Sequence, residues 1–503
     1  MKRTFFIIIS ITLSAAVCIN AQSRSDKRGI GWDEKNQPLT RHHMEQLQGG
    51  VAWVYNWGNA PKNPDLYSAS TMHFAPMCWN SYYNANAIRS YIDSHPETRY
   101  LLGFNEPNFS AQANMTPAAA AAAWPAVEKI AADYGLTLVA PALNFTGEYV
   151  GGRMWSPYEW LDEFFRLYPT AKADCLSLHC YMNWYSANTW FATEYFYVDL
   201  YDPTNDAYGR YPNLVKFLDG YKEANGHFPR MMLTEFCSWE NDGTITGVDF
   251  QIDQMTQKLQ KLEQSDLVEG YAWFMANADG GASAYPYMSI FNTNTATSTL
   301  SDLGKVYVNM SSFDTGKFYT PSETILAKDY VDATTDNQIV RLRPNTDSGS
   351  ASPLQLEMTP SAWTEYQLSV PHEGQYRITL RLKAADAGKG NFYLDGKRNC
   401  SFQYPSTSGG WTEVSFLATL TQGEHNVMLY NASTTSFYIN QWHYELESGD
   451  IGDVAGDGDA SVPYDVYDIS GIHLGSVNSL AGLSLPHGIY ILRRGSEAMK
   501  IRL

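Results

Sequence analysis

Two short stretches decide the fold: Leu101-Leu102-Gly103-Phe104-Asn105-Glu106-Pro107-Asn108 and Met231-Met232-Leu233-Thr234-Glu235-Phe236. Each is an apolar run that leads into a glutamate, which is typical of a buried parallel strand whose C-terminal end carries a carboxylate. In a β/α barrel, polar side chains at these strand ends surround a common mouth. The two stretches therefore predict a barrel with a pair of carboxylates at its mouth.

The surrounding sequence, residues 27–318, alternates strand-like runs with amphipathic helical stretches. The predicted strands are Gly29–Trp32, Ala52–Asn56, His73–Met77, Tyr100–Phe104, Thr137–Pro141, Leu176–Tyr181, Arg230–Glu235 and Gly270–Phe274. The predicted helices are Ala87–His95, Pro117–Tyr134, Tyr158–Arg166, Leu214–Ala224 and Phe250–Glu263. This length and order match a (β/α)8 TIM barrel. An open doubly wound sheet is the competing fold, but its G-x-G-x-x-G motif does not follow the first strand.

The pattern changes after Thr320-Pro321-Ser322, where short alternating runs predict an antiparallel β-sandwich (jelly-roll) at residues 323–446. Its predicted strands are Tyr366–Val370, Tyr376–Leu382, Phe392–Leu394, Val414–Ala418, Asn426–Tyr430 and Phe437–Tyr444. Residues 447–461 are polar and glycine-rich, which is typical of a linker. Residues 462–503 predict a small β domain, with strands at Val466–Ile469, Gly488–Leu492 and Met499–Leu503.

Residues 1–21 have the pattern of a secretory signal peptide, with Lys2 and Arg3 before an apolar stretch and a cleavage position after Ala21. Later segments are too interrupted to span a bilayer. We therefore expect a bacterial protein that is exported and is either secreted or held at the cell surface or outer membrane. We expect it to be a monomer.

Composition narrows the function classes. The formal net charge of −18 argues against nucleic acid and anionic membranes as partners. Aromatic residues make up 14% of the chain, including 14 Trp and 34 Tyr, which suggests surfaces that stack on sugars as well as cores. Five cysteines follow the leader; free thiols are favoured over one bridge among Cys175, Cys180 and Cys237. We expect no cofactor and no metal at the barrel.

The carboxylate pair suggests a reaction. On a barrel, the fourth and seventh strands face each other across the mouth, so Glu106 and Glu235 can flank one substrate. Cleavage of a glycosidic bond needs one acid to protonate the leaving oxygen and one carboxylate to attack or to activate water. Asn105 can hold a sugar hydroxyl, and a hydroxyl donor close to Glu235 would keep it ionised. A lone glutamate at a strand end is usually a solvated charge; two on facing strands, about 5 Å apart, would be a retaining pair.

Several motifs in order resemble those of glycoside hydrolase family 128. They are Lys27-Arg28-Gly29-Ile30-Gly31-Trp32, Tyr55-Asn56-Trp57, Phe74-Ala75-Pro76-Met77-Cys78-Trp79, Gly103-Phe104-Asn105-Glu106-Pro107, His179-Cys180-Tyr181 and Thr234-Glu235-Phe236. The resemblance covers about residues 27–310. It implies endo-β-1,3-glucanase activity on laminarin-like glucans with retention of configuration. It also implies Glu106 as the acid/base and Glu235 as the nucleophile.

Other residues are candidates for substrate binding. His179 and Tyr181 end the sixth strand and are expected to bind the nucleophile or the sugar at the cleavage site, although a core histidine is the alternative. The candidate stacking platforms are Trp57, Trp79, Trp184 and Trp273, and Asn56 could hold a hydroxyl. Packing roles remain the alternative for each ring.

The sandwich resembles carbohydrate-binding module family 6 through Ile325-Leu326-Ala327-Lys328-Asp329-Tyr330, Gly409-Gly410-Trp411 and Ile439-Asn440-Gln441-Trp442. The resemblance implies sugar contacts by Trp411 and Asn440. Such modules often have a glutamate at the position of Lys328 that helps to hold a structural calcium, so the lysine argues against that ion. The alternative is a sandwich that binds no sugar. Residues 462–503 resemble the C-terminal sorting domains of exported Bacteroidetes proteins.

The sequence thus predicts a secreted, retaining endo-hydrolase of β-1,3-glucan. The alternative enzyme is a retaining glycanase that acts on another β-glucan or on mannan. The alternative of a different class is a non-catalytic protein that captures glycan at a cell surface.

Overall fold

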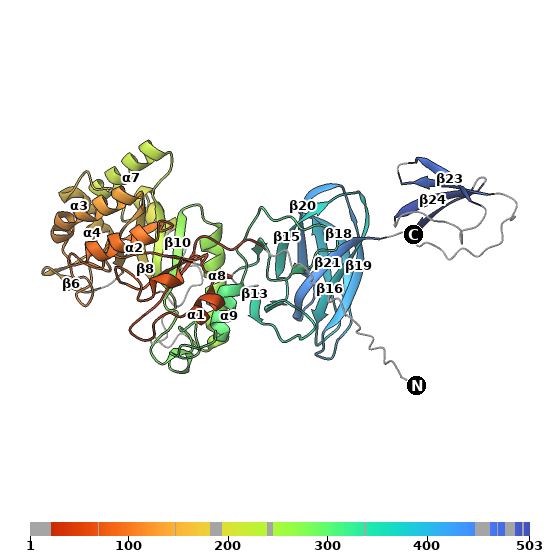
Figure 1. Ribbon diagram of the computed structural model, residues 1–503, viewed down its shortest axis with the longest axis horizontal. Helices are drawn as coiled ribbons and strands as arrows, with labels where there is room; N and C mark the ends of the chain where they lie inside the picture. Colours follow the sequence, from red (N-terminus) through yellow and green to blue (C-terminus); the bar gives the residue numbers. More distant parts are fainter. Residues whose placement is uncertain are drawn as a thin grey trace, which may run out of the picture.

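We describe the protein from a computed structural model of residues 22–68, 70–145, 147–181, 194–238, 245–335, 339–447, 463–469, 471–477, 488–494 and 497–502. The predicted leader, Trp184 and nearly all of the predicted linker lie outside these described residues. Figure 1 shows a region of alternating helices and strands beside a region of antiparallel strands.

The N-terminal region is a closed parallel sheet. Its strands are β1 (Arg28–Gly31), β2 (Trp53–Tyr55), β3 (His73–Phe74), β4 (Tyr100–Leu102), β5 (Thr137–Asn144), β8 (Cys175–Cys180), β9 (Arg230–Phe236) and β10 (Val268–Trp273). They pair in the order β3-β2-β1-β10-β9-β8-β5-β4. The backbone N–H of Cys78 donates to the Leu102 carbonyl at 2.9 Å, and the N–H of Leu102 donates to that of Pro76 at 2.9 Å. These bonds close the sheet into a (β/α)8-type barrel on the predicted strands.

Helices cover the outside of the barrel. They are α1 (Arg41–Leu47), α2 (Ala85–Ser94), α3 (Pro117–Tyr134), α4 (Pro157–Leu167), α6 (Phe196–Tyr201), α7 (Pro212–Asn225), α8 (Val248–Gln264) and α9 (Asp302–Asn309). The prediction for α3 is confirmed at both ends: the Thr116 side chain caps its first turn, Pro117 is the first helical residue, and Gly135 ends it with φ +66°. Helices α1, α6 and α9 were not predicted, because each spans only about two turns, which is shorter than the window in which a helical pattern is read.

Side chains fill the inside of the barrel. The buried set that forms this inner core comprises Ala52, Trp53, Tyr55, Ala75, Met77, Tyr100, Leu102, Val139, Cys175, Met232 and Ala272. The interior of the barrel is therefore a packed core rather than a pore. The five described cysteines, Cys78, Cys175, Cys180, Cys237 and Cys400, are free thiols, as favoured.

Two antiparallel sheets follow the barrel (Figure 1). One contains β11 (Ile325–Leu326), β13 (Val340–Pro344), β14 (Leu354–Met358), β16 (Gly374–Lys383), β19 (Thr412–Leu420) and β21 (Phe437–Leu446). The other contains β12 (Asp332–Ala333), β15 (Trp363–Val370), β17 (Gly388–Leu394), β18 (Lys397–Tyr404) and β20 (Gly423–Asn431). The sequence missed β11 and β12, which have two residues each, and β13, β14 and β18. Strands β13 and β18 lie at the edges of their sheets.

Polar contacts join the barrel to these sheets. Arg343 of β13 donates to Asp253 of α8 at 2.8 Å and contacts Asp249 at 2.9 Å. The amide of Gln260, also on α8, donates to the Asp332 carboxylate at 2.8 Å. Helix α8 therefore makes polar contacts with one strand of each antiparallel sheet.

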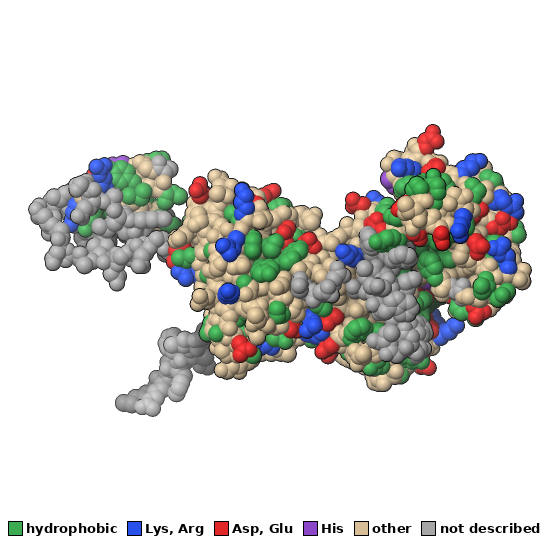
Figure 2. Space-filling model, turned by 180° about the vertical axis from the view of Figure 1, so that it is seen from behind, with side chains coloured by type: hydrophobic (Ala, Val, Ile, Leu, Met, Phe, Trp, Pro, Cys, Tyr) green, Lys and Arg blue, Asp and Glu red, His purple; other side chains and the backbone are tan. Residues whose placement is uncertain are grey.

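The C-terminal strands form a separate four-stranded sheet. Its strands are β22 (Tyr464–Asp468), β23 (His473–Val477), β24 (Ile489–Arg494) and β25 (Glu497–Arg502), in the order β23-β22-β24-β25. Strand β23 was not predicted. Figure 2 shows Lys and Arg side chains interspersed with Asp and Glu on the face that it presents. Among the described helices, none has the length and hydropathy needed to cross a bilayer.

Candidate active site

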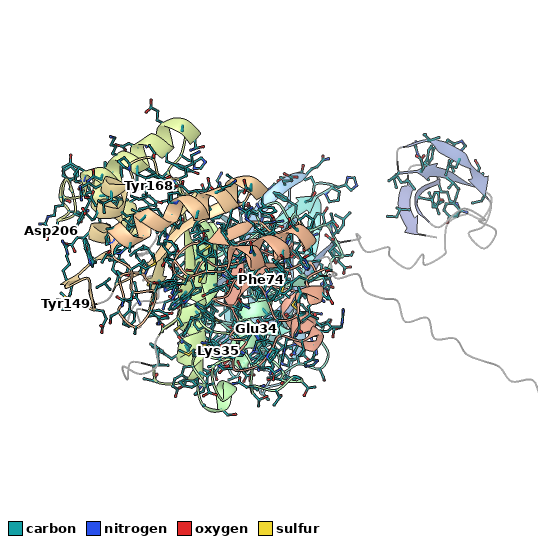
Figure 3. All side chains as sticks on the ribbon, turned by 60° about the vertical axis from the view of Figure 1, so that its left-hand side comes forward. Glu34, Lys35, Phe74, Tyr149, Tyr168 and Asp206 are labelled. Carbon is teal, nitrogen blue, oxygen red and sulfur yellow. The ribbon has the colours of Figure 1, made fainter. Side chains whose placement is uncertain are left out.

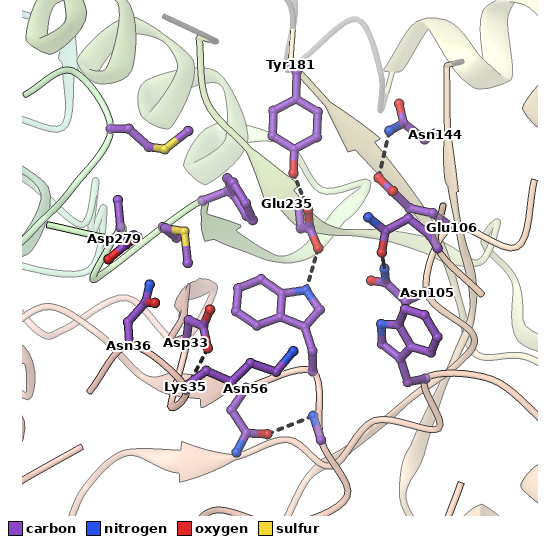
Figure 4. A pocket seen from close by; sticks show the side chains of 18 of the residues that line it. Asp33, Lys35, Asn36, Asn56, Asn105, Glu106, Asn144, Tyr181, Glu235 and Asp279 are labelled. Carbon is purple, nitrogen blue, oxygen red and sulfur yellow. Dashed lines mark hydrogen bonds between the residues drawn. The ribbon is translucent and has the colours of Figure 1, made fainter. Parts of the chain in front are cut away.

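A pocket of about 1010 Å³ opens at the C-terminal ends of the barrel strands. It contains both predicted glutamates (Figure 4). The residues that line it are Asp33, Lys35, Asn36, Asn56, Trp57, Gly58, Trp79, Asn105, Glu106, Phe109, Gln112, Asn144, Tyr181, Glu235, Phe274, Met275, Ala278, Asp279, Tyr285 and Met288. This is the end of the barrel at which the sequence placed the chemistry.

The two glutamates lie close together on facing strands. Glu106 follows β4, the fourth barrel strand, and Glu235 lies in β9, the seventh. A carboxylate oxygen of Glu106 and one of Glu235 lie within 4.8 Å of each other. Glu106 has φ +45°, a left-handed conformation that costs energy for a side chain with a Cβ. Gly103 lets the chain approach β5 just before this residue, since a Cβ there would lie 2.7 Å from the Val139 carbonyl oxygen.

Neutral donors bind both oxygens of Glu235. The indole N–H of Trp57 donates to Oε1 at 2.6 Å, and the hydroxyl of Tyr181 donates to Oε2 (Figure 4). Burial raises the pKa of Glu235, His179 opposes this shift, the charge of Glu106 adds to it, and both hydrogen bonds lower it. Burial also raises the pKa of Tyr181 well above its ordinary value, so the phenol stays a neutral donor. The net pKa of Glu235 is therefore above that of a solvated glutamate.

Among the described residues, Glu106 has hydrogen-bond partners at one carboxylate oxygen only. The side-chain amide of Asn144 donates to Oε1 at 2.7 Å, and Nδ1 of His179 lies 2.7 Å from the same oxygen. Oε2 is therefore the oxygen that remains for an acidic proton. Asn144 ends β5 and lies on the same side of the pocket as Glu106 (Figure 4).

A buried chain of hydrogen bonds places a proton on Nε2 of His179. Ser177 donates to the Met232 carbonyl at 2.8 Å, so Thr234, 3.1 Å away, must donate to Ser177. The Thr234 oxygen then accepts from Nε2 of His179 at 2.9 Å, while Nδ1 donates to Glu106. The two neighbouring acids favour a second proton on Nδ1, which then donates to Glu106. Burial alone would lower the pKa of His179, but the neighbouring Glu235 and Glu106 raise it above its ordinary value.

The same three side chains could also hold a metal ion. Within the described ranges, Glu106, His179 and Glu235 are the single group of three potential ligands whose atoms lie this close together. However, His179 directs a proton at Glu106, and Glu235 already accepts from Trp57 and Tyr181. The arrangement suits proton transfer better than metal binding.

The structure places most predicted binding residues around this pocket. Trp79 lies half-buried on the wall, and Asn105 lies beside Glu106 with its amide donating to Gln112 at 3.3 Å. The side-chain oxygen of Asn105, Oδ1, is buried and has no hydrogen-bond partner among the described residues, so a ligand hydroxyl could satisfy it. Asn56 also lines the pocket, but its amide donates to Glu34 at 2.7 Å and its oxygen accepts from Gly58 at 2.9 Å.

Of the predicted stacking platforms, Trp273 needs correction, and Trp184 cannot be compared with the prediction. Trp273 is fully buried in the barrel and donates its indole N–H to the Met288 carbonyl at 2.8 Å. Its ring cannot reach a sugar, and that prediction is wrong because the residue points outward from β10 into the layer between strands and helices. Trp184 lies outside the described residues. Trp57 lines the pocket as predicted, but its contact with Glu235 was not foreseen.

Asn144 is the main residue that sequence reasoning missed. The expected strand ended at Pro141, whereas β5 continues to Asn144 across a register shift between Val139 and Ala142. The signal was present, since an apolar run Ala142-Leu143 leads into a polar residue, as at Glu106. Other pocket residues, such as Phe109, Phe274 and Tyr285, follow strand ends without a motif.

Of the two residues predicted to contact sugar on the antiparallel sheets, one is accessible to solvent and the other is buried. Trp411 is half-exposed, and the Lys383 ammonium lies 4.9 Å from the centre of its ring and 4.6 Å from that of Tyr438. Asn440 is fully buried and donates to Asp347 at 2.9 Å, so direct contact with a sugar is ruled out in this conformation. The Lys328 ammonium contacts the buried Asp329 carboxylate. The positive charge of the lysine therefore lies beside an acid of the segment that was compared with calcium-binding modules.

Two carboxylates at the mouth of a β/α barrel, one buried between neutral donors and one bonded through a single oxygen, define a glycoside hydrolase. A family model described as "Glycosyl hydrolase catalytic core" matches residues 29–307. The chain belongs to this family, and the protein is a glycoside hydrolase.

Individual proteins are similar to part of the chain. Alkali-sensitive linkage protein 1 of Schizosaccharomyces pombe is 26% identical over 297 residues, which cover 57% of this chain and 45% of that protein. The chain thus spans less than half the length of this curated relative. A GH128 (subgroup II) endo-beta-1,3-glucanase from Pseudomonas viridiflava is 29% identical, covers 57% of this chain and 98% of its own, and has a TM-score of 0.42. A GH128 (subgroup I) enzyme from Amycolatopsis mediterranei, in complex with laminaritriose, is 22% identical, covers 56% and 98%, and has a TM-score of 0.38.

Proposed function

We propose that the protein is a secreted, retaining endo-β-1,3-glucanase with Glu235 as nucleophile and Glu106 as acid/base. The observation that carries the mechanism is the separation of their carboxylate oxygens, which is within 4.8 Å. Retaining enzymes hold the two groups about 5–5.5 Å apart, whereas inverting enzymes leave roughly 6.5–9.5 Å for a water molecule.

In the first step, Glu235 attacks the anomeric carbon while Glu106 protonates the leaving oxygen. The pair that binds Glu235, Trp57 and Tyr181, donates to both of its oxygens and favours the carboxylate. Asn144 and His179 hold Oε1 of Glu106, which leaves Oε2 to carry the proton into the pocket. A charged His179 balances the charge of Glu235.

In the second step, Glu106 has lost its proton and takes one from water, which attacks the glycosyl ester at Glu235. Esterification removes the negative charge of Glu235, so the carboxylate of Glu106 then has His179 as its nearest charged partner. This balance favours an ionised Glu106 at the moment when a base is needed. Configuration at the anomeric carbon is retained after two inversions.

The linkage is proposed from the ordered strand-end motifs, which resemble glycoside hydrolase family 128. The similar enzymes from Pseudomonas viridiflava and Amycolatopsis mediterranei are themselves described as endo-beta-1,3-glucanases. A retaining enzyme for another β-glucan or mannan would use the same two carboxylates, so the substrate must be tested directly.

The decisive experiment is a digest of laminarin, cellulose and mannan oligosaccharides with the full chain, in which NMR reports the anomer released first. We expect laminarin to yield β-anomers. Glu235→Gln should lose hydrolysis but still bind the glucan, and Glu223→Gln, an exposed change on α7, should behave as wild type. Release from cellulose or mannan alone would select the alternative linkage. Binding of glucan without hydrolysis by the wild type would select the glycan-capture function.

Three accessory roles belong to the same proposal. We propose export through residues 1–21, on their sequence pattern, and this predicts a mature protein that begins at Gln22; N-terminal sequencing of secreted material tests it. We also propose that the half-exposed Trp411 lets the antiparallel sheets bind glucan. Trp411→Ala should then weaken retention on insoluble β-1,3-glucan and leave hydrolysis of soluble oligosaccharides unchanged.

We propose surface sorting for residues 462–503, tested by deleting them and following export.

A further inference from the structure

A small hairpin at the barrel mouth presents its apolar face to solvent. It consists of β6 (Tyr149–Val150) and β7 (Arg153–Met154), and it follows Asn144 after a few residues. Tyr149 pairs directly with Met154, so their side chains share one face, and they are 62% and 49% exposed. Val150, on the other face, is buried. Exposed Phe145 lies on the same segment.

The hairpin has a tight turn, and hydrogen bonds tie its flanking residues to the loop that follows Glu106. Its turn residues, Gly151 and Gly152, have φ +62° and +88°, which suits a tight two-residue turn. A Cβ on Gly151 would lie 2.5 Å from Thr116, the residue that caps α3. The amide of Asn108 donates to the carbonyl oxygens of Asn144 and Trp155 at 2.7 and 3.1 Å.

The roles of Glu235 and Glu106 determine the direction in which a sugar chain lies in the pocket. The nucleophile lies beneath the anomeric carbon, and the acid must reach the leaving oxygen, so the leaving sugar lies on the Glu106 side. Figure 4 shows Glu106 and Asn144 on one side of Glu235, and Asp33, Asn36 and Asp279 on the other. The leaving part of the chain therefore passes Asn144 and continues toward the hairpin.

Figure 3 shows Tyr149 at the outer edge of the barrel, well separated from Lys35, which lines the opposite end of the pocket. A protein surface that exposes a paired aromatic and thioether on a preformed hairpin next to a substrate pocket has the features of a binding platform. Tyr82, on the β3 side of the mouth, is 90% exposed but is an isolated ring.

We propose that Tyr149 and Met154 form a distal acceptor subsite, which binds a glucosyl unit of the leaving chain beyond the first. This inference rests on the proposed function, since it takes a β-glucan as substrate and Glu106 as the acid. A pyranose stacks its C–H face on Tyr149 and packs its edge against Met154. The subsite makes the enzyme favour long leaving groups, as an internal cut requires.

The test compares a long and a short leaving group with the full chain. Laminarihexaose offers a leaving chain of several sugars, whereas 4-nitrophenyl β-laminaribioside offers one aryl group. We expect Tyr149→Ala to lower kcat/KM on the hexaose roughly three- to tenfold, the worth of one stacked ring, and to leave that on the aryl glycoside unchanged. Tyr149→Phe, which keeps the ring, should restore the hexaose value.

Tyr82→Ala is the matched control, since it removes an exposed tyrosine elsewhere on the mouth and should alter neither substrate. An unchanged hexaose value in Tyr149→Ala would overturn the subsite, as would an equal loss on both substrates. A hexaose-selective loss in Tyr82→Ala but not in Tyr149→Ala would place the acceptor path on the β3 side. If the wild type cleaved neither substrate, the proposed function itself would fail, which distinguishes the two failures.

Discussion

Two buried clusters of charge lie at opposite ends of the same barrel, and they have different consequences. At the base, Arg28 of β1 pairs with Glu263 of α8 at 3.1 Å, and both side chains are almost fully buried. At the mouth, Glu106 and Glu235 share one histidine, His179. At the base, the permanent charge of Arg28 is paired with one acid. At the mouth, two acids lie beside His179, whose charge can be lost by deprotonation.

The base cluster is saturated with hydrogen bonds. Arg28 donates to the carbonyl oxygens of Tyr307 and Ser311 at 3.0 and 2.6 Å and to the hydroxyl of Tyr271 at 3.0 Å. Burial alone would lower the pKa of Arg28, but Tyr271 and Glu263 raise it, so the charge is fixed. The mouth cluster faces a pocket and keeps one carboxylate oxygen for a substrate. At the base, full pairing of the buried charges stabilises the fold. At the mouth, the charges of the buried groups can change, and this suits them to catalysis.

The largest expected effect comes from removing the mouth nucleophile. Glu235→Gln should lower kcat by roughly four orders of magnitude or more, because the glycosyl ester cannot form. The midpoint of urea unfolding should stay equal or rise at neutral pH, because the change removes an acid whose burial is unfavourable. A large fall in stability would contradict the view that this cluster serves chemistry at a cost to the fold.

The base cluster should respond in the opposite way. Glu263→Ala leaves Arg28 buried without its acid and should cost about 3–5 kcal/mol of unfolding free energy. Activity per folded molecule should not change, since the pair lies at the far end of the barrel. Urea unfolding and active-site titration with a glycosyl inactivator separate the two quantities, and Glu223→Gln on the surface is the control. Equal losses of activity and stability at both ends would erase the distinction.

Tyr181 should have an intermediate effect that depends on pH. Its hydroxyl donates to Glu235 and lowers the pKa of that carboxyl, so Tyr181→Phe should raise the pKa further. The nucleophile must be ionised, so activity falls as pH drops through this pKa. The acid limb of kcat/KM should therefore move to higher pH, with a loss of about 10- to 100-fold at neutral pH.

A matched change at the base is Tyr307→Phe, which removes a hydroxyl that donates to the Gly29 carbonyl. It should leave the pH profile in place. A profile that moves in both variants, or in neither, would mean that the hydroxyl of Tyr181 does not set the ionisation of Glu235.

The sequence specified the barrel and its carboxylates because both depend on local patterns. Apolar runs that end in Glu106 and Glu235 locate strand ends without any knowledge of packing. Asn144 escaped because Pro141 looks like a strand terminus, whereas a register shift lets β5 continue past it. Trp273 and Asn440 were misplaced because burial depends on which face of a strand meets a neighbouring layer. The role of Trp57 as a donor depends on a contact between distant strands, which no local pattern encodes.

A third cluster of charge, at the junction between the barrel and the antiparallel sheets, should give the smallest effect. Asp253 of α8 is partly buried against Arg343 and Arg341. Burial raises the pKa of Asp253, and the hydrogen bond from Arg343 lowers it. Arg343→Gln should therefore raise this pKa further and cost about 1–2 kcal/mol at neutral pH.

The sign of the pH dependence follows from proton binding. A carboxyl whose pKa is raised on folding binds more protons in the folded state, so its contribution to stability falls as pH rises from the unfolded to the folded pKa. The Arg343→Gln variant should therefore lose more stability, relative to wild type, at pH 7 than at pH 4. Arg377→Gln, which removes a more exposed ion pair with Glu447, should show little change at either pH. A loss independent of pH would assign the contribution of Arg343 to packing, and the junction would then resemble neither end of the barrel.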